Sequence, residues 1–195
     1  MVCMGKISLV FVIAAMGISP VWPQGVDLEK EFAAAVTRAK AGDVAAQTDV
    51  GSAYLMGRGV APDLEQAEQW FRKAAEQDSS TAQHQLGMIC AEKSHGGKFP
   101  QFEKEAVQWW TKAAEQGNRK AAWQLGHAYA GGTGVAKNNV QAYKWLNLAV
   151  TRFGTEGARD DLENLAKLMT RDQIAEAQKL SAEFKARTRE PQKTK

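Results

Sequence analysis

Metal or acid–base chemistry in this chain would depend on its few histidines and cysteines. His84 lies six positions before Cys90, and His95 lies five positions after it. These three residues make a poor metal site because no carboxylate accompanies them at ligand spacing. We therefore expect no metal site and no other cofactor.

Hydrolysis would need a nucleophile beside a base, and Ser52 with His84 is the pairing that we weigh for it. The sequence contains no Ser-x-x-Lys, and Gly97-Lys98 is followed by phenylalanine, without the upstream glycine of a phosphate loop. We therefore expect no catalytic residue. A hydrolase acting on a cell-wall or β-lactam substrate is the alternative.

A repeat organises the rest of the chain. The stretch Val44–Gln77 recurs twice, so that Gly51 returns 36 positions later as Gly87 and 39 positions after that as Gly126. Trp70 likewise returns as Trp109 and Trp145. Repeats of this length predict a helical solenoid.

Each copy predicts two helices, A and B, joined by a loop that carries glycines. Gly51, Gly87 and Gly126 lie within the A helices, where a missing Cβ allows the A and B helices to approach closely. The loop glycines supply turns with positive φ rather than nucleotide sites. Cys90 holds the position of a tyrosine in the other copies, which predicts a buried, inert thiol.

Local signals set the expected helix ends. Asp27 caps a helix that runs to Lys40, the second A helix begins at Ser80, and its B helix spans about Glu103 to Gln116. Two further helices follow the repeats. The first runs from Arg159 to Met169, with Leu162, Leu165 and Leu168 on one side, and the second opens with the capping box Thr170–Gln173.

The N-terminus is typical of a secretory signal peptide. Lys6 precedes the apolar run Ile7–Ile18, which is too short for a bilayer span and ends at Pro20 and Pro23. We expect an exported protein, periplasmic or secreted. An uncleaved N-terminus would instead make it a membrane-tethered scaffold, and this is the one case in which we expect membrane contact.

The charge balance argues against a nucleic-acid partner. The 25 lysines and arginines face 22 aspartates and glutamates, and the basic residues are scattered along the chain.

The repeat resembles the Sel1-like repeat family, which is related to the tetratricopeptide repeats. The third copy carries the family's Leu-Gly-x-x-Tyr as Leu125, Gly126 and Tyr129, whereas the second copy has Cys90 in place of the tyrosine. The resemblance implies an all-α, right-handed α-solenoid of three helix–loop–helix repeats that holds a protein or peptide partner as an adaptor or regulator. Family members described as β-lactamase-like carry paired cysteines in each repeat, which this chain lacks.

The expected organisation has five parts: a signal peptide and linker (1–25), an N-terminal capping helix (26–42), the repeats (43–79, 80–117 and 118–154), two C-terminal capping helices (155–187) and a basic tail (188–195). In the middle copy we expect Trp109 to be a core residue whose replacement by alanine costs roughly 3–5 kcal/mol.

The candidate partner-binding residues lie on the face of the A helices that we expect to line the concave side of the solenoid. We call this set the A-helix strip: Thr48, Ser52, Leu55, His84, Met88, Ala91, Trp123, His127 and Ala130. Its two histidines predict partner binding that weakens below about pH 6. Trp123 has a second interpretation, in which it packs under the following helix.

Overall fold

The computed structural model describes residues 27–153 and 156–189, and this part of the chain folds as a stack of helices without a strand. The predicted signal peptide and the end of the basic tail lie outside these residues. The helices are α1 (Leu28–Lys40), α2 (Val44–Met56), α3 (Leu64–Glu76), α4 (Ser80–Lys93), α5 (Pro100–Glu115), α6 (Arg119–Gly131), α7 (Asn139–Phe153), α8 (Glu156–Ala166) and α9 (Arg171–Arg189).

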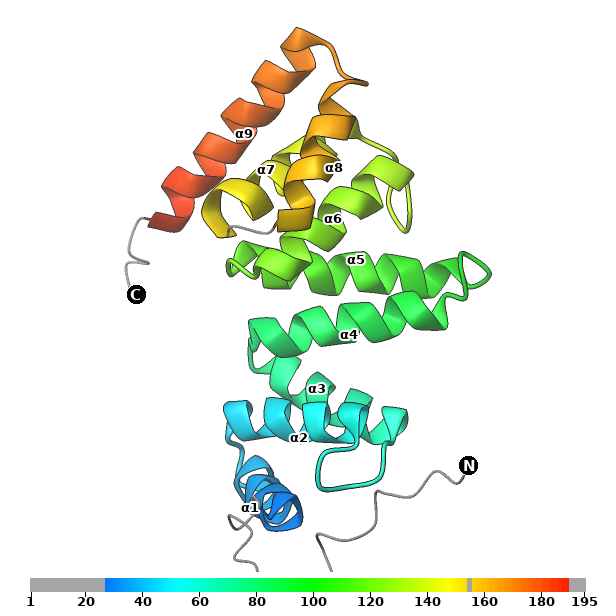
Figure 1. Ribbon diagram of the computed structural model, residues 1–195, viewed down its shortest axis with the longest axis vertical. Coiled ribbons are helices and arrows are strands. Elements are labelled where there is room, and N and C mark those ends of the chain that lie inside the picture. Colours follow the sequence, from blue (N-terminus) through cyan, green and yellow to red (C-terminus); the bar gives the residue numbers. More distant parts are fainter. Residues whose placement is uncertain (1–26, 154–155, 190–195) are drawn as a thin grey trace, which may run out of the picture.

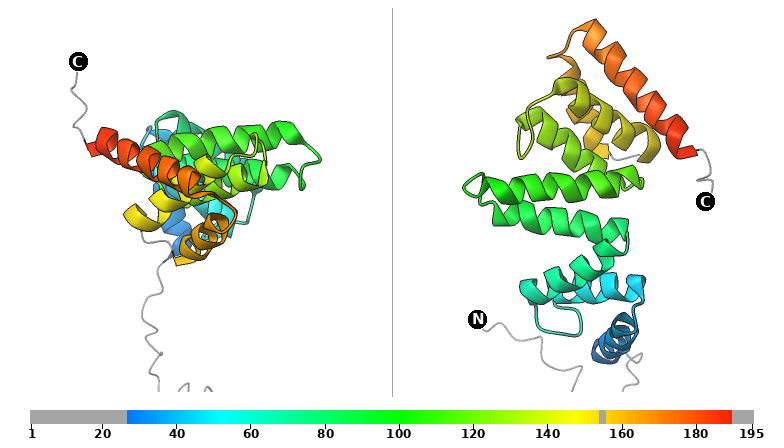
Figure 2. Two further views of the ribbon diagram at one scale, coloured as in Figure 1. Left: turned by 90° about the horizontal axis from the view of Figure 1, so that it is seen from above. Right: turned by 180° about the vertical axis from the view of Figure 1, so that it is seen from behind.

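The stack is an α-solenoid, as the repeat predicted. Each helix packs mainly against its neighbours in sequence, and α9 returns to pack along α7. Figure 1 shows the progression from α1 at one end to α8 and α9 at the other, and Figure 2 shows the same order from behind. The A helices are α2, α4 and α6, and the B helices are α3, α5 and α7.

Side-chain caps fix most of the A- and B-helix starts. Asp43, Asp63 and Asn118 each accept a hydrogen bond from the backbone N–H three residues on, at 2.9–3.1 Å. The start expected at Ser80 is confirmed for α4, and Ser79, the residue before it, accepts the capping bond at 3.3 Å. The capping box before α9 is confirmed, since Thr170 and Gln173 exchange hydrogen bonds at 3.0 and 3.3 Å.

Close approach of A and B helices at the three glycines is also confirmed. A Cβ on Gly51 would lie 2.8 Å from the Phe71 ring, and one on Gly87 would lie 2.2 Å from Nε1 of Trp110. At Gly126 the nearest atoms belong to Leu146, at 2.6 Å. The B-helix residue after the repeated tryptophan therefore packs directly on the A-helix backbone in every copy.

Buried glutamines join successive repeats. Gln47 and Gln83 occupy the same repeat position. Each donates from Nε2 to a backbone carbonyl in the last turn of the preceding helix, α1 or α3, at 3.1 and 3.2 Å. Each also accepts a 2.8 Å hydrogen bond from a glutamine that follows its own B helix, Gln77 or Gln116. These bonds satisfy buried amides and helix-terminal carbonyls together, and they link each repeat to the helix before it.

Two expected helices begin earlier than the local signals indicated. The second B helix starts at Pro100 rather than near Glu103, because a proline at the first helical position loses no hydrogen bond there. The helix expected from Arg159 begins at Glu156 and ends at Ala166. Leu168 therefore lies beyond α8, with 76% of its surface exposed, and does not join the apolar side with Leu165.

The core of the second repeat differs from the prediction in one residue. Trp109 is half-buried, and its indole donates to Glu105 at 3.2 Å, whereas Trp110 is only 6% exposed. Cys90 is 1% exposed, which confirms a buried cysteine, and burial raises the pKa of its thiol to about 12. A small cysteine and a large tryptophan thus fill the space that a tyrosine and a smaller apolar residue fill in the other repeats.

Candidate partner-binding surface

Of the three strip residues in the first repeat, only Leu55 is exposed. Oγ1 of Thr48 lies 3.1 Å from Oγ of Ser79, the residue that caps α4. Ser52 is half-buried and donates from its hydroxyl to the carbonyl oxygen of Thr48 at 2.9 Å. Leu55 is exposed and offers an apolar side chain to solvent.

In the second repeat, Met88 is the exposed member of the strip, and Ala91 is half-buried. His84 is buried, and this burial together with the charge of Lys120 lowers its pKa to about 4. His84 therefore stays neutral between pH 5.5 and 7.5. Burial of His84 therefore argues against its part in the predicted pH dependence of partner binding.

In the third repeat, Trp123 and His127 are tied to the helix that follows the repeats. Asp161 of α8 accepts at Oδ2 from the Trp123 indole at 2.6 Å and lies 3.1 Å from Nε2 of His127. The two rings pack edge to face at 5.4 Å, and Ala130 is half-buried. Trp123 thus packs under the next helix, while His127 keeps half of its side chain exposed.

Side-chain contacts link the strip residues of successive repeats. Contacts lead from α2 to α4 through Thr48 and from α4 to α6 through Gln124, whose side-chain nitrogen lies 3.3 Å from the sulfur of Met88. At α8, Asp161 contacts the strip residues Trp123 and His127. The accessible side chains of the strip, Leu55, Met88 and His127, come from three different repeats.

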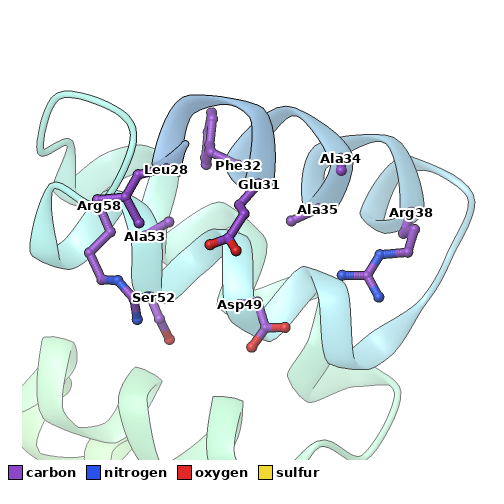
Figure 3. A pocket seen from close by; sticks show the side chains of 10 residues that line it. All are labelled: Leu28, Glu31, Phe32, Ala34, Ala35, Arg38, Asp49, Ser52, Ala53 and Arg58. Atoms are coloured by element: carbon purple, nitrogen blue, oxygen red, sulfur yellow. The ribbon is translucent and has the colours of Figure 1, made fainter. Parts of the chain in front are cut away.

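A pocket of about 430 Å³ opens beside the first repeat, between α1 and α2 (Figure 3). The sequence did not single it out, because its residues come from two helices and a loop. We call it the α1–α2 pocket, and its lining is Leu28, Glu31, Phe32, Ala34, Ala35, Arg38, Asp49, Ser52, Ala53 and Arg58. Ser52 belongs to both the pocket and the A-helix strip, so the two surfaces meet there.

The described residues contain no group of three or more metal-ligating side chains and no serine or cysteine hydrogen-bonded to a histidine. The Ser52 hydroxyl donates its hydrogen bond to the carbonyl oxygen of Thr48, and the imidazole of His84 is buried. Across residues 27–153 and 156–189, no helix has the length and apolar character needed to cross a bilayer.

The fold and the repeated packing define a class of protein, the α-solenoid built from tandem helix pairs. The family model for the Sel1 repeat matches residues 44–79, 80–118 and 119–152. The chain therefore belongs to the Sel1-repeat family.

Solved structures resemble this chain to different extents. A Sel1 repeat protein from Oxalobacter formigenes is 32% identical, over 69% of this chain and 98% of its own length, with a TM-score of 0.59. A protective antigen from uropathogenic Escherichia coli that displays an SLR fold is 26% identical, over 85% of this chain and 45% of its own, with a TM-score of 0.47. The comparison with curated proteins found no match.

Proposed function

We propose that this protein is an exported, non-catalytic adaptor that binds a protein or peptide partner along the A-helix strip. The observation that carries the proposal is the exposure of two apolar side chains of the strip, Leu55 and Met88, at 37% and 39%. Exposed apolar groups beside polar side chains are typical of interaction surfaces, and methionine adapts to varied partners. Sel1 repeats generally mediate protein–protein interactions, which supports this assignment.

The strip residues divide into two groups by their packing. Leu55, Met88 and His127 are accessible to a partner, whereas His84 and Trp123 support the surface from below. A substitution at His84 or Trp123 would therefore disturb folding and binding together. A test of partner binding needs the exposed positions.

The experiment is affinity capture from an envelope extract of the source cells, with the full chain carrying a C-terminal tag. The test variant is Leu55→Glu/Met88→Glu, which places two charges at exposed positions of the strip. The matched control is Leu64→Glu/Leu168→Glu, which charges two exposed leucines off the strip. Circular dichroism first establishes that both variants keep the helical content of the wild type.

We expect a discrete protein that the wild type and the control retain and that the strip variant loses. Retention of the same proteins by all three chains would contradict binding through the strip. Retention by none would contradict the adaptor function itself.

The export component rests on the N-terminal sequence, Lys6 followed by the apolar run Ile7–Ile18, which lies outside the described residues. Its test is the intact mass of the tagged chain recovered from the periplasm or medium. We expect a mass that lacks the first 17 to 25 residues, a range set by the two cut sites that the small residues Gly17 and Gly25 allow. An uncleaved chain in the membrane fraction would favour the membrane-tethered scaffold.

A further inference from the structure

The α1–α2 pocket carries four charged side chains that make no ion pair within residues 27–153 and 156–189. These are the carboxylates of Glu31 and Asp49 and the guanidinium groups of Arg38 and Arg58. All four residues are exposed.

Elsewhere the chain does pair its charges on neighbouring helices. Arg72 of α3 bonds to Glu68 at 3.2 Å and to Glu105 of α5 at 3.3 Å, and Lys93 also bonds to Glu68. Opposite charges that line one pocket without pairing leave their electrostatic complementarity available to a ligand.

The four charges have an order along the pocket. In Figure 3 the carboxylate of Glu31 extends from α1 toward α2, the carboxylate of Asp49 lies beyond it on α2, and Arg58 and Arg38 lie on either side. Glu31 and Arg38 are seven residues apart on α1, so two helical turns, about 10 Å, separate them along the axis. Along the pocket the side-chain charge is therefore positive at Arg58, negative at Glu31 and Asp49, and positive at Arg38.

The floor of the pocket is apolar. Phe32 is half-buried and packs edge to face on Tyr54 at a ring separation of 5.3 Å, and the alanines of both helices complete the floor. A lysine or arginine side chain has a matching character, with an aliphatic stem and a charged tip. The stem would lie on the apolar floor while its cation meets the two carboxylates.

We propose that the α1–α2 pocket binds a lysine or arginine side chain of the partner's extended segment, with an acidic side chain of the same segment on Arg38. An extended chain rises about 3.3 Å per residue, so about 10 Å corresponds to three residues. The partner segment therefore carries an acidic residue about three positions from the basic one. This inference rests on the proposed adaptor function and adds a specificity site at the N-terminal end of the A-helix strip, joined to it at Ser52.

The test starts from a random dodecapeptide phage library selected on the wild-type chain. We expect the selected peptides to share a lysine or arginine with an acidic residue two to four positions away. One selected peptide is then synthesised with a fluorescent label, and its Kd is measured by anisotropy against protein variants.

The pocket variant is Glu31→Lys/Asp49→Lys, and the matched control is Glu76→Lys/Glu115→Lys. The control makes the same change in net charge at exposed helix ends outside the pocket. We expect the pocket variant to raise the Kd about tenfold or more and the control to leave it within about twofold. A peptide with its basic residue changed to glutamate should bind the pocket variant more tightly than it binds the wild type.

The outcomes separate the two proposals. Selected peptides without a shared basic residue, or an equal Kd for the pocket variant and its control, would overturn the specificity site. If the selected peptides still bind Leu55→Glu/Met88→Glu more weakly than they bind the wild type, the adaptor function stands without the pocket. Selection of no peptide that depends on either surface would overturn both.

Discussion

The glycine within each A helix gives the most quantitative prediction about the solenoid, and Gly87→Ala is its strongest case. A Cβ at this position would lie 2.2 Å from Nε1 and 2.4 Å from Cδ1 of Trp110, a side chain that is 6% exposed. The ring cannot move aside without displacing the rest of the core. The substitution should therefore force α4 and α5 apart.

The size of the effect is a balance of two terms. Alanine in place of glycine inside a helix gains about 1 kcal/mol from backbone entropy. Overpacking a well-packed core costs about 1–3 kcal/mol and occasionally more, and a contact this short lies at the upper end. We expect a net loss of about 2 kcal/mol in the free energy of unfolding, or about 4–8 °C in melting temperature for a chain of this size.

The assay is urea denaturation followed by circular dichroism, with Gly131→Ala as the control. Gly131 is the last residue of α6, is exposed, and has Thr133 Oγ1 at 3.3 Å as its nearest neighbour, so its replacement should be nearly neutral. The losses should rank with the contacts: Gly87 above Gly126 at 2.6 Å, and Gly126 above Gly51 at 2.8 Å. A Gly87→Ala chain as stable as the wild type would refute close A–B packing as the reason for these glycines.

Three further predictions concern the second repeat. Trp110→Ala should cost roughly 3–5 kcal/mol and Trp109→Ala clearly less, because only Trp110 is buried; denaturant midpoints measured side by side would show the reverse order if this is wrong. The pKa of His84 lies at about 4 when folded and near 6.5 when unfolded, so its stabilising contribution is complete above about pH 6.5 and is lost as the pH falls toward 4, by roughly 3 kcal/mol. An NMR titration of the folded chain that placed this pKa near 6.5 would contradict the buried position of His84. Cys90 should resist a disulfide reagent at pH 8 until the chain is unfolded, and prompt labelling of the native protein would be the opposing result.

The sequence predicted the features that repeat. Gly51, Gly87 and Gly126 indicate close helix packing because the same constraint returns in each copy. The predicted caps Asp27 and Thr170 each bond to a residue only three positions away. Such local and periodic signals are readable without a structure.

Features that depend on distant residues were not readable. The Asp161 carboxylate that holds Trp123 and His127 is 38 residues from Trp123, and no periodicity links them. The α1–α2 pocket brings Arg58 from a loop to Glu31 and Arg38 on a helix outside the repeats. The helical period predicts on which side of its helix a residue lies. Whether that side is buried depends on packing against other helices, and His84 is buried although we expected it on an accessible face.

Binding of a partner through the exposed part of the A-helix strip is tested most directly by photo-crosslinking in the source cells. A photoreactive phenylalanine analogue replaces Met88 in one tagged chain and Leu64 in another, two residues of nearly equal exposure on an A helix and a B helix. We predict a discrete, light-dependent product of higher mass from position 88 and none from position 64. The same products from both positions, or a product from position 64 alone, would contradict the account.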